Sequence, residues 1–212
     1  MSTQLRHSLL LLLTAFIWGV AFVAQSVGMD YVGPFTFTAS RSLIGAVVLL
    51  PVIWFRTKKE NGVKAEQKKG TAVDKQEKKN LLRGGIVCGV FLCIATNLQQ
   101  IGLQYSTVGK SGFVTAMYIV LVPVLGIFFH KGIDRQKVIS VILAVCGLYL
   151  LCMTDGNFSI GKGDIFTILC ALAFSLQILS VDHFAPKVDC VKLASLQFLV
   201  CGICSCMPML LF

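Results

Sequence analysis

Charged residues are scarce in this sequence, and their scarcity excludes a soluble globular domain. Asp, Glu, Lys and Arg make up 14% of the 212 residues, whereas soluble domains carry about 25%. Acids are the rarer kind, with 10 Asp and Glu against 19 Lys and Arg. Apolar residues make up 56% of the chain, and the mean hydropathy is +0.79. This composition is typical of a protein that is embedded in the lipid bilayer.

The motifs of enzymes and metal sites are also missing. There is no HExxH, no GxSxG and no pair of acids within an apolar run, so we expect no enzyme. The three histidines have no metal-ligand spacing on one helix, and we expect no metal and no cofactor. Residues 156–163 have GxxxxGK spacing, but Gly163 follows where a phosphate-binding loop needs Ser or Thr. A glycine-rich turn explains this stretch better.

Long uncharged runs are what the sequence has instead. At 1.5 Å per residue, about 20 apolar residues cross the roughly 30 Å of hydrocarbon. These runs are too long and too uniformly apolar for the strands of a barrel. The first continues to Val27 without a small-residue cleavage motif, which favours a retained span over a signal peptide. We therefore expect an all-α, multi-pass transmembrane helical bundle with seven spans, at residues 8–27, 34–55, 84–104, 111–129, 138–154, 165–181 and 193–212.

The basic residues are distributed unevenly over the connections between these runs. Ten of them lie in residues 56–83, and alternate assignment of the connections gives sixteen Lys and Arg on one side and two, Lys110 and Lys162, on the other. Since positive residues mark the cytoplasmic side, we expect a cytoplasmic N-terminus. A basic, poorly ordered cytoplasmic linker at 56–83, close to anionic headgroups, explains the +9 net charge. Nucleic acid is not an expected partner.

Several stretches resemble a known family. They are AFIWGVAFV in the first run, ASRSLIGAVVLLP in the second, NLQQIGLQYSTVGKSGFVTAMYIVLVPVLGIFF across the third and fourth, and VILAVCGLYLL in the fifth. Together they resemble the EamA-like drug/metabolite transporters over residues 8–154. One departure is Asp134, the only acid where members commonly have a Glu after the fourth span.

The resemblance implies an architecture and an activity. The architecture is ten helices in two inverted five-helix repeats. Residues 1–154 would form the first repeat, and residues 155–212 the start of a second, truncated one, with seven of the ten spans present. The implied location is a bacterial plasma (inner) membrane. The implied activity is secondary, ATP-independent transport of a small polar metabolite, such as an amino acid or a related compound, by alternating access. We expect export, and a homodimer is an open alternative to a monomer.

Arg41 is the only formal charge well inside a predicted span, about 10 Å from its start at Pro34. A central Arg costs roughly 2.5–3.5 kcal/mol to insert, so it should face the bundle interior or a water-filled cavity. It is expected either to anchor an anionic group of the substrate or to tie neighbouring helices together. Both roles are compatible with the sequence.

Polar and aromatic side chains on other runs predict the rest of a cavity. Asn97 and Gln100 share one face of the third run, and buried amides in lipid need partners, so this face should turn inward. The predicted substrate-binding set is Trp18, Arg41, Asn97, Gln100, Tyr118 and Gln177. Asp182 and His183, at the inner edge of the sixth run, are the nearest thing to a proton-coupling pair.

Two other functions remain open from the sequence. Cys201 and Cys204 have the spacing of a redox pair, which would suit a membrane-embedded thiol redox protein, although small apolar packing residues are the simpler interpretation. A membrane scaffold that transports nothing is the other alternative.

Overall fold

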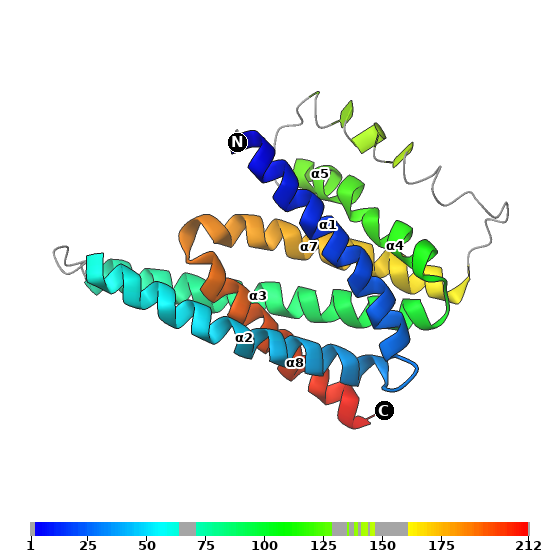
Figure 1. Ribbon diagram of the computed structural model, residues 1–212, viewed down its shortest axis with the longest axis horizontal. Helices are drawn as coiled ribbons and strands as arrows, with labels where there is room; N and C mark the ends of the chain where they lie inside the picture. The colour runs from blue at the N-terminus through cyan, green and yellow to red at the C-terminus, as the bar shows by residue number, and fades with distance from the viewer. Residues whose placement is uncertain are drawn as a thin grey trace.

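The structure, a computed structural model, describes residues 3–63, 71–128 and 161–211 and isolated positions between 135 and 146. Within these ranges every regular element is a helix (Figure 1). The predicted fifth span, 138–154, lies largely outside the described residues, as do His130, Asp134 and residues 156–160 of the glycine-rich turn. The elements are α1 (Thr3–Gly28), α2 (Pro34–Val63), α3 (Thr71–Gln104), α4 (Val108–Ala116), α5 (Tyr118–Phe128), α7 (Lys162–Phe184), the short 3₁₀ helix η2 (Ala185–Lys187) and α8 (Cys190–Leu211).

The described part of the chain contains six helical segments that are long and apolar enough to cross a membrane. They coincide with six of the seven predicted spans, and the all-α, multi-pass architecture is confirmed. The fourth span is formed by two helices, because α4 ends at Ala116 and α5 begins at Tyr118. The carbonyl of Met117, between them, accepts bonds from the N–H groups of both Val120 and Leu121. Pro123 lies inside α5, six residues after this break.

Helices α1, α3 and α8 run one way along the bundle, and α2, α4, α5 and α7 run the other way, so the bundle has two chemically different ends (Figure 1). At one end α2 finishes, α3 starts and α7 passes through η2 into α8. We call it the basic end, since it carries Arg56, Arg83, Lys187 and Lys192. At the other end α1 turns into α2, α3 turns into α4 and α7 begins. We call this the Lys110 end.

Helices α3, α7 and α8 form the core, and α2 packs along α8. Their buried apolar cluster comprises Leu92, Ala95, Cys170, Ala173, Phe174 and Cys201. The close approach of α3 to α8 depends on Gly85 and Gly89, since small residues let membrane helices pack closely. A Cβ on Gly89 would lie 2.6 Å from the Cβ of Val200 and 2.9 Å from the carbonyl oxygen of Gln197. A larger residue there would push the two helices apart.

Helix α1 is peripheral. Only 6% of its membrane-spanning window is buried, and its leucines face outward, with Leu11 and Leu12 about 70% exposed. In a bilayer these side chains contact acyl chains, so α1 closes one side of the bundle without entering the core.

The linker at 56–83 was expected to be poorly ordered, and this was wrong at both of its ends. Helix α2 continues to Val63 and α3 starts at Thr71. Lys, Glu, Gln and Ala are good helix formers, and Gln76 donates a 3.2 Å hydrogen bond to Asn80 one turn later. The two helices therefore extend together past the bundle at the basic end (Figure 1).

Candidate functional site

A cavity of about 350 Å³ lies within the bundle, and residues from α1, α2, α3, α7 and α8 line it. Most of its wall is apolar or aromatic, and its polar groups are few. The lining residues are Ile17, Trp18, Ala21, Phe22, Gln25, Arg41, Ser42, Gly45, Leu92, Thr96, Gln99, Phe174 and Phe198. None of these lining residues is an acid, and Arg41 is the one that carries a charge.

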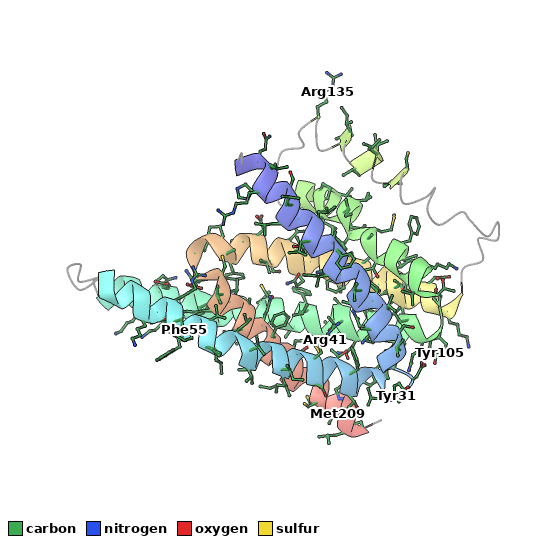
Figure 2. All side chains as sticks on the ribbon, in the orientation of Figure 1. Tyr31, Arg41, Phe55, Tyr105, Arg135 and Met209 are labelled. Carbon is green, nitrogen blue, oxygen red and sulfur yellow. The ribbon has the colours of Figure 1, made fainter. Side chains whose placement is uncertain are left out.

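Arg41 supplies that charge from the first third of α2. The half-buried side chain lies within the outline of the bundle, whereas Tyr31 and Tyr105 lie at its periphery (Figure 2). The guanidinium carbon lies 5.9 Å from the ring centroid of Phe37, one turn earlier, within cation–π range. Within the described ranges no carboxylate pairs with Arg41 and no neighbouring helix accepts a hydrogen bond from it. This part of the chain thus offers no sign that Arg41 ties helices together.

The polar groups of the wall are anchored to different degrees. Thr96 donates to the carbonyl of Leu92 at 2.7 Å, and the Ser42 hydroxyl lies 3.3 Å from the Sγ of Cys201. The Nε2 of Gln99 donates a long 3.5 Å bond to Thr115 of α4. Gln25 Oε1 is buried and has no partner among the described residues. Gln25 Oε1 could therefore accept a hydrogen bond from a ligand, and Gln99 would exchange only a long bond for one to a ligand.

Two of the six predicted substrate-binding residues line the cavity: Trp18 and Arg41. Tyr118 stands behind the wall, with its ring 6.4 Å from the ring of Phe174. The other three, Asn97, Gln100 and Gln177, are buried elsewhere in the bundle.

Those three amides differ in their partners. Asn97 Nδ2 donates to Ser205 of α8 at 2.9 Å, and Gln177 Nε2 donates to Gln197 of α8 at 3.1 Å. Gln100 is completely buried, and neither of its amide atoms has a partner within the described ranges. Asn97 and Gln177 thus link helices in this structure, and a substrate-binding role for all three stays a prediction.

Asn97 and Gln100 were expected to line the cavity, but a neighbouring face of α3 lines it instead. The cavity side carries Leu92, Thr96 and Gln99, whereas the predicted face carried Asn97 and Gln100. Adjacent residues on a helix are about 100° apart, so the cavity face is displaced by one residue. The i, i+3 spacing of Thr96 and Gln99 is itself a polar stripe that could have been noticed.

The other candidate pairs occupy different places. Cys201 is fully buried against Ser42 and Thr96, and Cys204 is half-buried; every described cysteine is a free thiol. Asp182 and His183 both border a cleft of about 640 Å³ near the basic end. Adjacent residues of a helix do not face each other, and the Nε2 of His183 lies 2.7 Å from the Nζ of Lys187 instead. Proton coupling by these two residues stays a prediction.

One acid that the sequence placed in a connection proves to be part of a span. The apolar run was drawn from residue 165, but α7 and its candidate span begin at Lys162. Asp164 consequently lies in the first turn of α7, where it is 4% exposed.

Comparison with known proteins identifies what this chain is similar to. A model of the EamA-like transporter family matches residues 5–153. A protein of Archaeoglobus fulgidus named "uncharacterized transporter" is 29% identical over 188 residues, which cover 88% of this chain and 52% of the relative. Two Bacillus subtilis proteins, named uncharacterized transporters YoaV and YetK, are each 26% identical, and they cover 76% and 84% of this chain and 50% and 52% of their own lengths. The chain thus spans about half the length of these relatives. No solved structure matches it.

Proposed function

This chain belongs to the EamA-like transporter family, and we propose that it carries a small polar metabolite, such as an amino acid or a related compound, across the membrane. The chain would act as a secondary transporter, which uses no ATP. The membrane-spanning helices and the relatives that are named transporters support it.

The observation that carries the proposal is the guanidinium of Arg41 in an otherwise uncharged cavity wall. A cation with no protein anion beside it favours a ligand that brings its own negative charge. A guanidinium can donate two parallel hydrogen bonds to a carboxylate, in a geometry that Lys cannot reproduce. Arg41 would hold the anionic group, and Gln25 and Gln99 would bond the remaining polar groups of the substrate.

The size and walls of the cavity restrict the ligand further. A volume of about 350 Å³ is at the lower end of the range for small-molecule pockets, roughly 300–1,000 Å³. Trp18, Phe22, Phe174 and Phe198 would cover the apolar portion of the substrate. Amino-acid-sized compounds suit both constraints.

We propose transport by alternating access across a bacterial plasma membrane. In this orientation the basic end faces the cytoplasm. The uneven distribution of Lys and Arg supports this orientation. Export is the proposed direction, because efflux down a metabolite gradient needs no coupling carboxylate in the cavity wall. Association into a homodimer stays a prediction.

Ligand binding to the purified chain tests the proposal. A panel of amino acids and small carboxylates is screened by thermal stabilisation in detergent, and the best ligand is titrated against Arg41→Gln and Arg41→Lys. Hydrogen bonds to charged groups contribute about 1.5–3 kcal/mol, so Arg41→Gln should weaken binding about 10- to 150-fold. Arg41→Lys should recover part of this loss, because it keeps the charge without the planar fork.

Arg83→Gln is the matched control, since it removes an exposed arginine of α3 outside the cavity. It should leave the affinity unchanged. An anionic ligand that binds Arg41→Gln as tightly as the unmodified chain would contradict the anchoring role.

A further inference from the structure

Six buried polar atoms have no hydrogen-bond partner among the described residues, and all of them lie in the half of the bundle toward the Lys110 end. They belong to Gln25, Thr38, Asn97, Gln100 and Ser111. Gln25 and Gln100 stand three and four residues before the ends of α1 and α3, and Thr38 and Ser111 are the fifth and fourth residues of α2 and α4. At 1.5 Å per residue, these four lie about 5 Å from the helix ends. Buried polar atoms without partners are few in folded proteins, and each needs an explanation.

Thr38 and Gln100 lie one helical turn beyond polar residues of the cavity. Thr38 precedes Ser42 by four residues in α2, and Gln100 follows Thr96 by four residues in α3. The hydroxyls of Ser42 and Thr96 lie 3.3 and 3.7 Å from one shared atom, the Sγ of Cys201. Helices α2 and α3 therefore approach each other at the level of the cavity. Because residues four apart share a face of a helix, Thr38 and Gln100 continue the same two faces toward the Lys110 end.

Ser111 has the same relation to the cavity wall on α4. It precedes Thr115 by four residues, and Thr115 accepts the long bond from Gln99 of the cavity wall. We call Thr38, Gln100 and Ser111 the unpaired layer. Their side chains are at most 1% exposed. The unpaired layer thus lies next to the cavity, on its Lys110 side.

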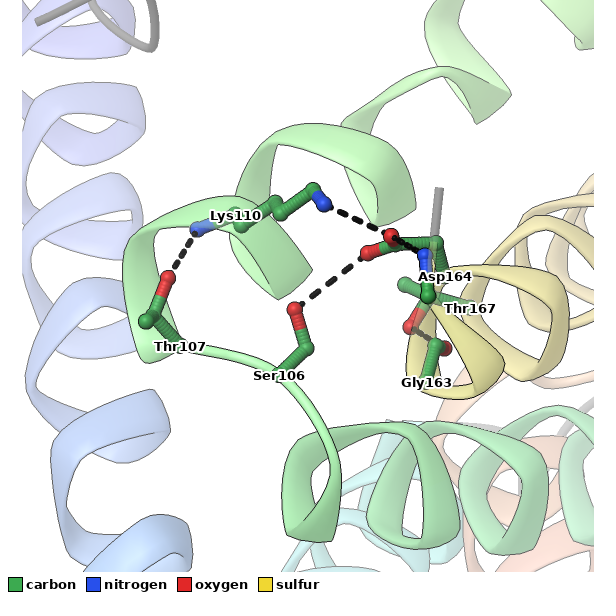
Figure 3. A network of polar contacts seen from close by, with 7 residues as sticks. Ser106, Thr107, Lys110, Gly163, Asp164 and Thr167 are labelled. Atoms are coloured by element: carbon green, nitrogen blue, oxygen red, sulfur yellow. Dashed lines mark hydrogen bonds and ion pairs between the residues drawn. The ribbon is translucent and has the colours of Figure 1, made fainter. Parts of the chain in front are cut away.

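Other buried polar groups at the same end do have partners. On α7, Thr167 donates to the carbonyl of Gly163 at 2.8 Å (Figure 3). The carboxylate of Asp164 accepts a 2.6 Å bond from the ammonium of Lys110 and a 3.3 Å bond from the hydroxyl of Ser106. The missing partners are therefore a property of the unpaired layer and not of the whole Lys110 end.

Buried polar groups in the half toward the basic end are bonded as well. Gln177 donates to Gln197 at 3.1 Å, and Ser195 donates to the carbonyl of Ala46 at 3.3 Å. A buried polar atom without a partner makes the arrangement that buries it less stable. Water would supply the missing bonds of the unpaired layer, whereas the paired groups of the basic half would gain little from water.

We propose that the unpaired layer is the part of the transport path that joins the cavity to the Lys110 side, and that it opens to water in the alternate state of the transporter. The inference rests on the proposed function, because a path has a use only if the cavity opens to the two ends in turn. Hydroxyl and amide groups can each donate and accept hydrogen bonds, so the layer suits the polar groups of a passing metabolite in place of its hydration shell. In the closed arrangement the same groups are dry and unpaired, which limits the stability of that arrangement.

Labelling of introduced thiols tests whether the unpaired layer opens. Thr38→Cys places a thiol in the layer. Thr167→Cys is the matched control, because both threonines are fully buried and lie toward the same end. Tyr31→Cys, at a position that is 84% exposed at the Lys110 end, gives the rate of an accessible thiol. The probe is a membrane-impermeant anionic methanethiosulfonate, applied from the Lys110 side of sealed vesicles, and peptide mass spectrometry separates each introduced thiol from the native cysteines.

The labelling rates should follow the population of the open state. An open state populated at about 0.1–10% should label Thr38→Cys about 10- to 1,000-fold more slowly than Tyr31→Cys. Thr167→Cys should be slower again by about tenfold or more, because its site keeps its partners. Equal rates for Thr38→Cys and Thr167→Cys would overturn the path.

A second substitution tests the physical reason for the opening. Gln100→Leu removes two unpaired atoms, so in the Thr38→Cys background it should favour the closed arrangement and slow labelling about tenfold. Gln197→Leu, at a paired amide of the basic half, should leave this rate unchanged. Labelling that is not slowed by Gln100→Leu would contradict the proposal.

Thermal stability gives a readout that does not depend on vesicles. Gln100→Leu should raise the apparent melting midpoint in detergent by about 2–12 °C, because it removes buried atoms that have no partner. Gln197→Leu should lower the midpoint, since Gln177 would lose its partner. A lower midpoint for Gln100→Leu would show that the closed fold needs this amide, and the role of the layer would be wrong.

The path and the transport proposal fail in different ways. Labelling of Thr38→Cys, but not of Thr167→Cys, in a chain that binds none of the screened metabolites would support the path and count against the proposed substrate class. Metabolite binding that depends on Arg41, with equal labelling of Thr38→Cys and Thr167→Cys, would overturn the path alone.

Discussion

Replacing Gly163 with Ala should separate α7 from α3 and destabilise the fold. A Cβ on Gly163 would lie 2.8 Å from the carbonyl oxygen of Gly102 and 2.9 Å from the carbonyl carbon of Tyr105. Both atoms belong to the backbone of α3 or to the residue that follows it, so no side-chain rotation can relieve the contact. The helices themselves must move.

The magnitude follows from the cost of overpacking. One extra methyl group in a closely packed interface costs about 1–3 kcal/mol. For a chain of about this size, 1 kcal/mol lowers the melting midpoint by about 2–4 °C. Gly163→Ala should therefore lower the apparent melting midpoint by about 2–12 °C.

Gly112→Ala provides the control for the loss of a helical glycine. Nothing lies within 4 Å of a Cβ placed on Gly112, inside α4. Ala is better than Gly in a helix by about 0.5–1 kcal/mol, so this change should raise the midpoint by about 1–4 °C. Both variants are compared in one detergent at one scan rate, by the far-ultraviolet circular dichroism of the helices. Equal midpoints for Gly163→Ala and Gly112→Ala would refute the close packing of α3 on α7.

Two smaller effects can be measured in the same assay. A double-mutant cycle with Gln177→Leu and Gln197→Leu should give a coupling of about 0.6 kcal/mol, typical of one hydrogen bond between membrane helices; a coupling of zero would contradict the 3.1 Å bond. Asp189→Ala should cost about 0.5–2 kcal/mol, because Oδ1 of Asp189 accepts two N–H bonds at the start of α8, at 2.8 and 3.1 Å. Partial burial alone would raise the pKa of Asp189, but these bonds and the charges of Arg56 and Lys192 outweigh it and hold the pKa below the ordinary 3.8. A lowered pKa means that the contribution is present above about pH 4 and is lost as the pH falls through the folded-state value, so the cost of Asp189→Ala should be constant between pH 5 and 8, roughly, and should shrink in stronger acid.

The spans could be predicted from the sequence because each is a local property of one uncharged run. The position of Arg41 in the wall could also be anticipated, since the cost of exposing a guanidinium to lipid leaves few alternatives. Which of two neighbouring faces of α3 lines the cavity could not be predicted from the sequence. Thr96 and Asn97 are both polar, and the positions of α1 and α8 decide which one meets the cavity and which one bonds Ser205.

The burial of Asp164 could not be predicted from the sequence either, for a different reason. The sixth span was drawn from the first uncharged residue after Asp164, so the carboxylate was placed outside it. Its burial depends on Lys110, which is 54 residues earlier in the chain. No pattern within residues 165–181 contains this information. The helical ends of the 56–83 segment were missed for the opposite reason, because a high content of Lys and Glu is compatible with both a solvated helix and an unfolded linker.

The extension of α2 and α3 beyond the bundle offers a way to measure motion. Their 30 and 34 residues correspond to about 45 and 51 Å at 1.5 Å per residue, which is some 15–20 Å more than the roughly 30 Å of hydrocarbon. Part of each helix therefore extends out of the membrane into the water, and it moves with the part inside the membrane when the helix tilts. At the tip of an arm of about 20 Å, a tilt of about 10° becomes a displacement of about 3.5 Å. A small rotation hidden in the membrane is thus magnified at the ends of α2 and α3, where spectroscopic probes can follow it without touching the cavity.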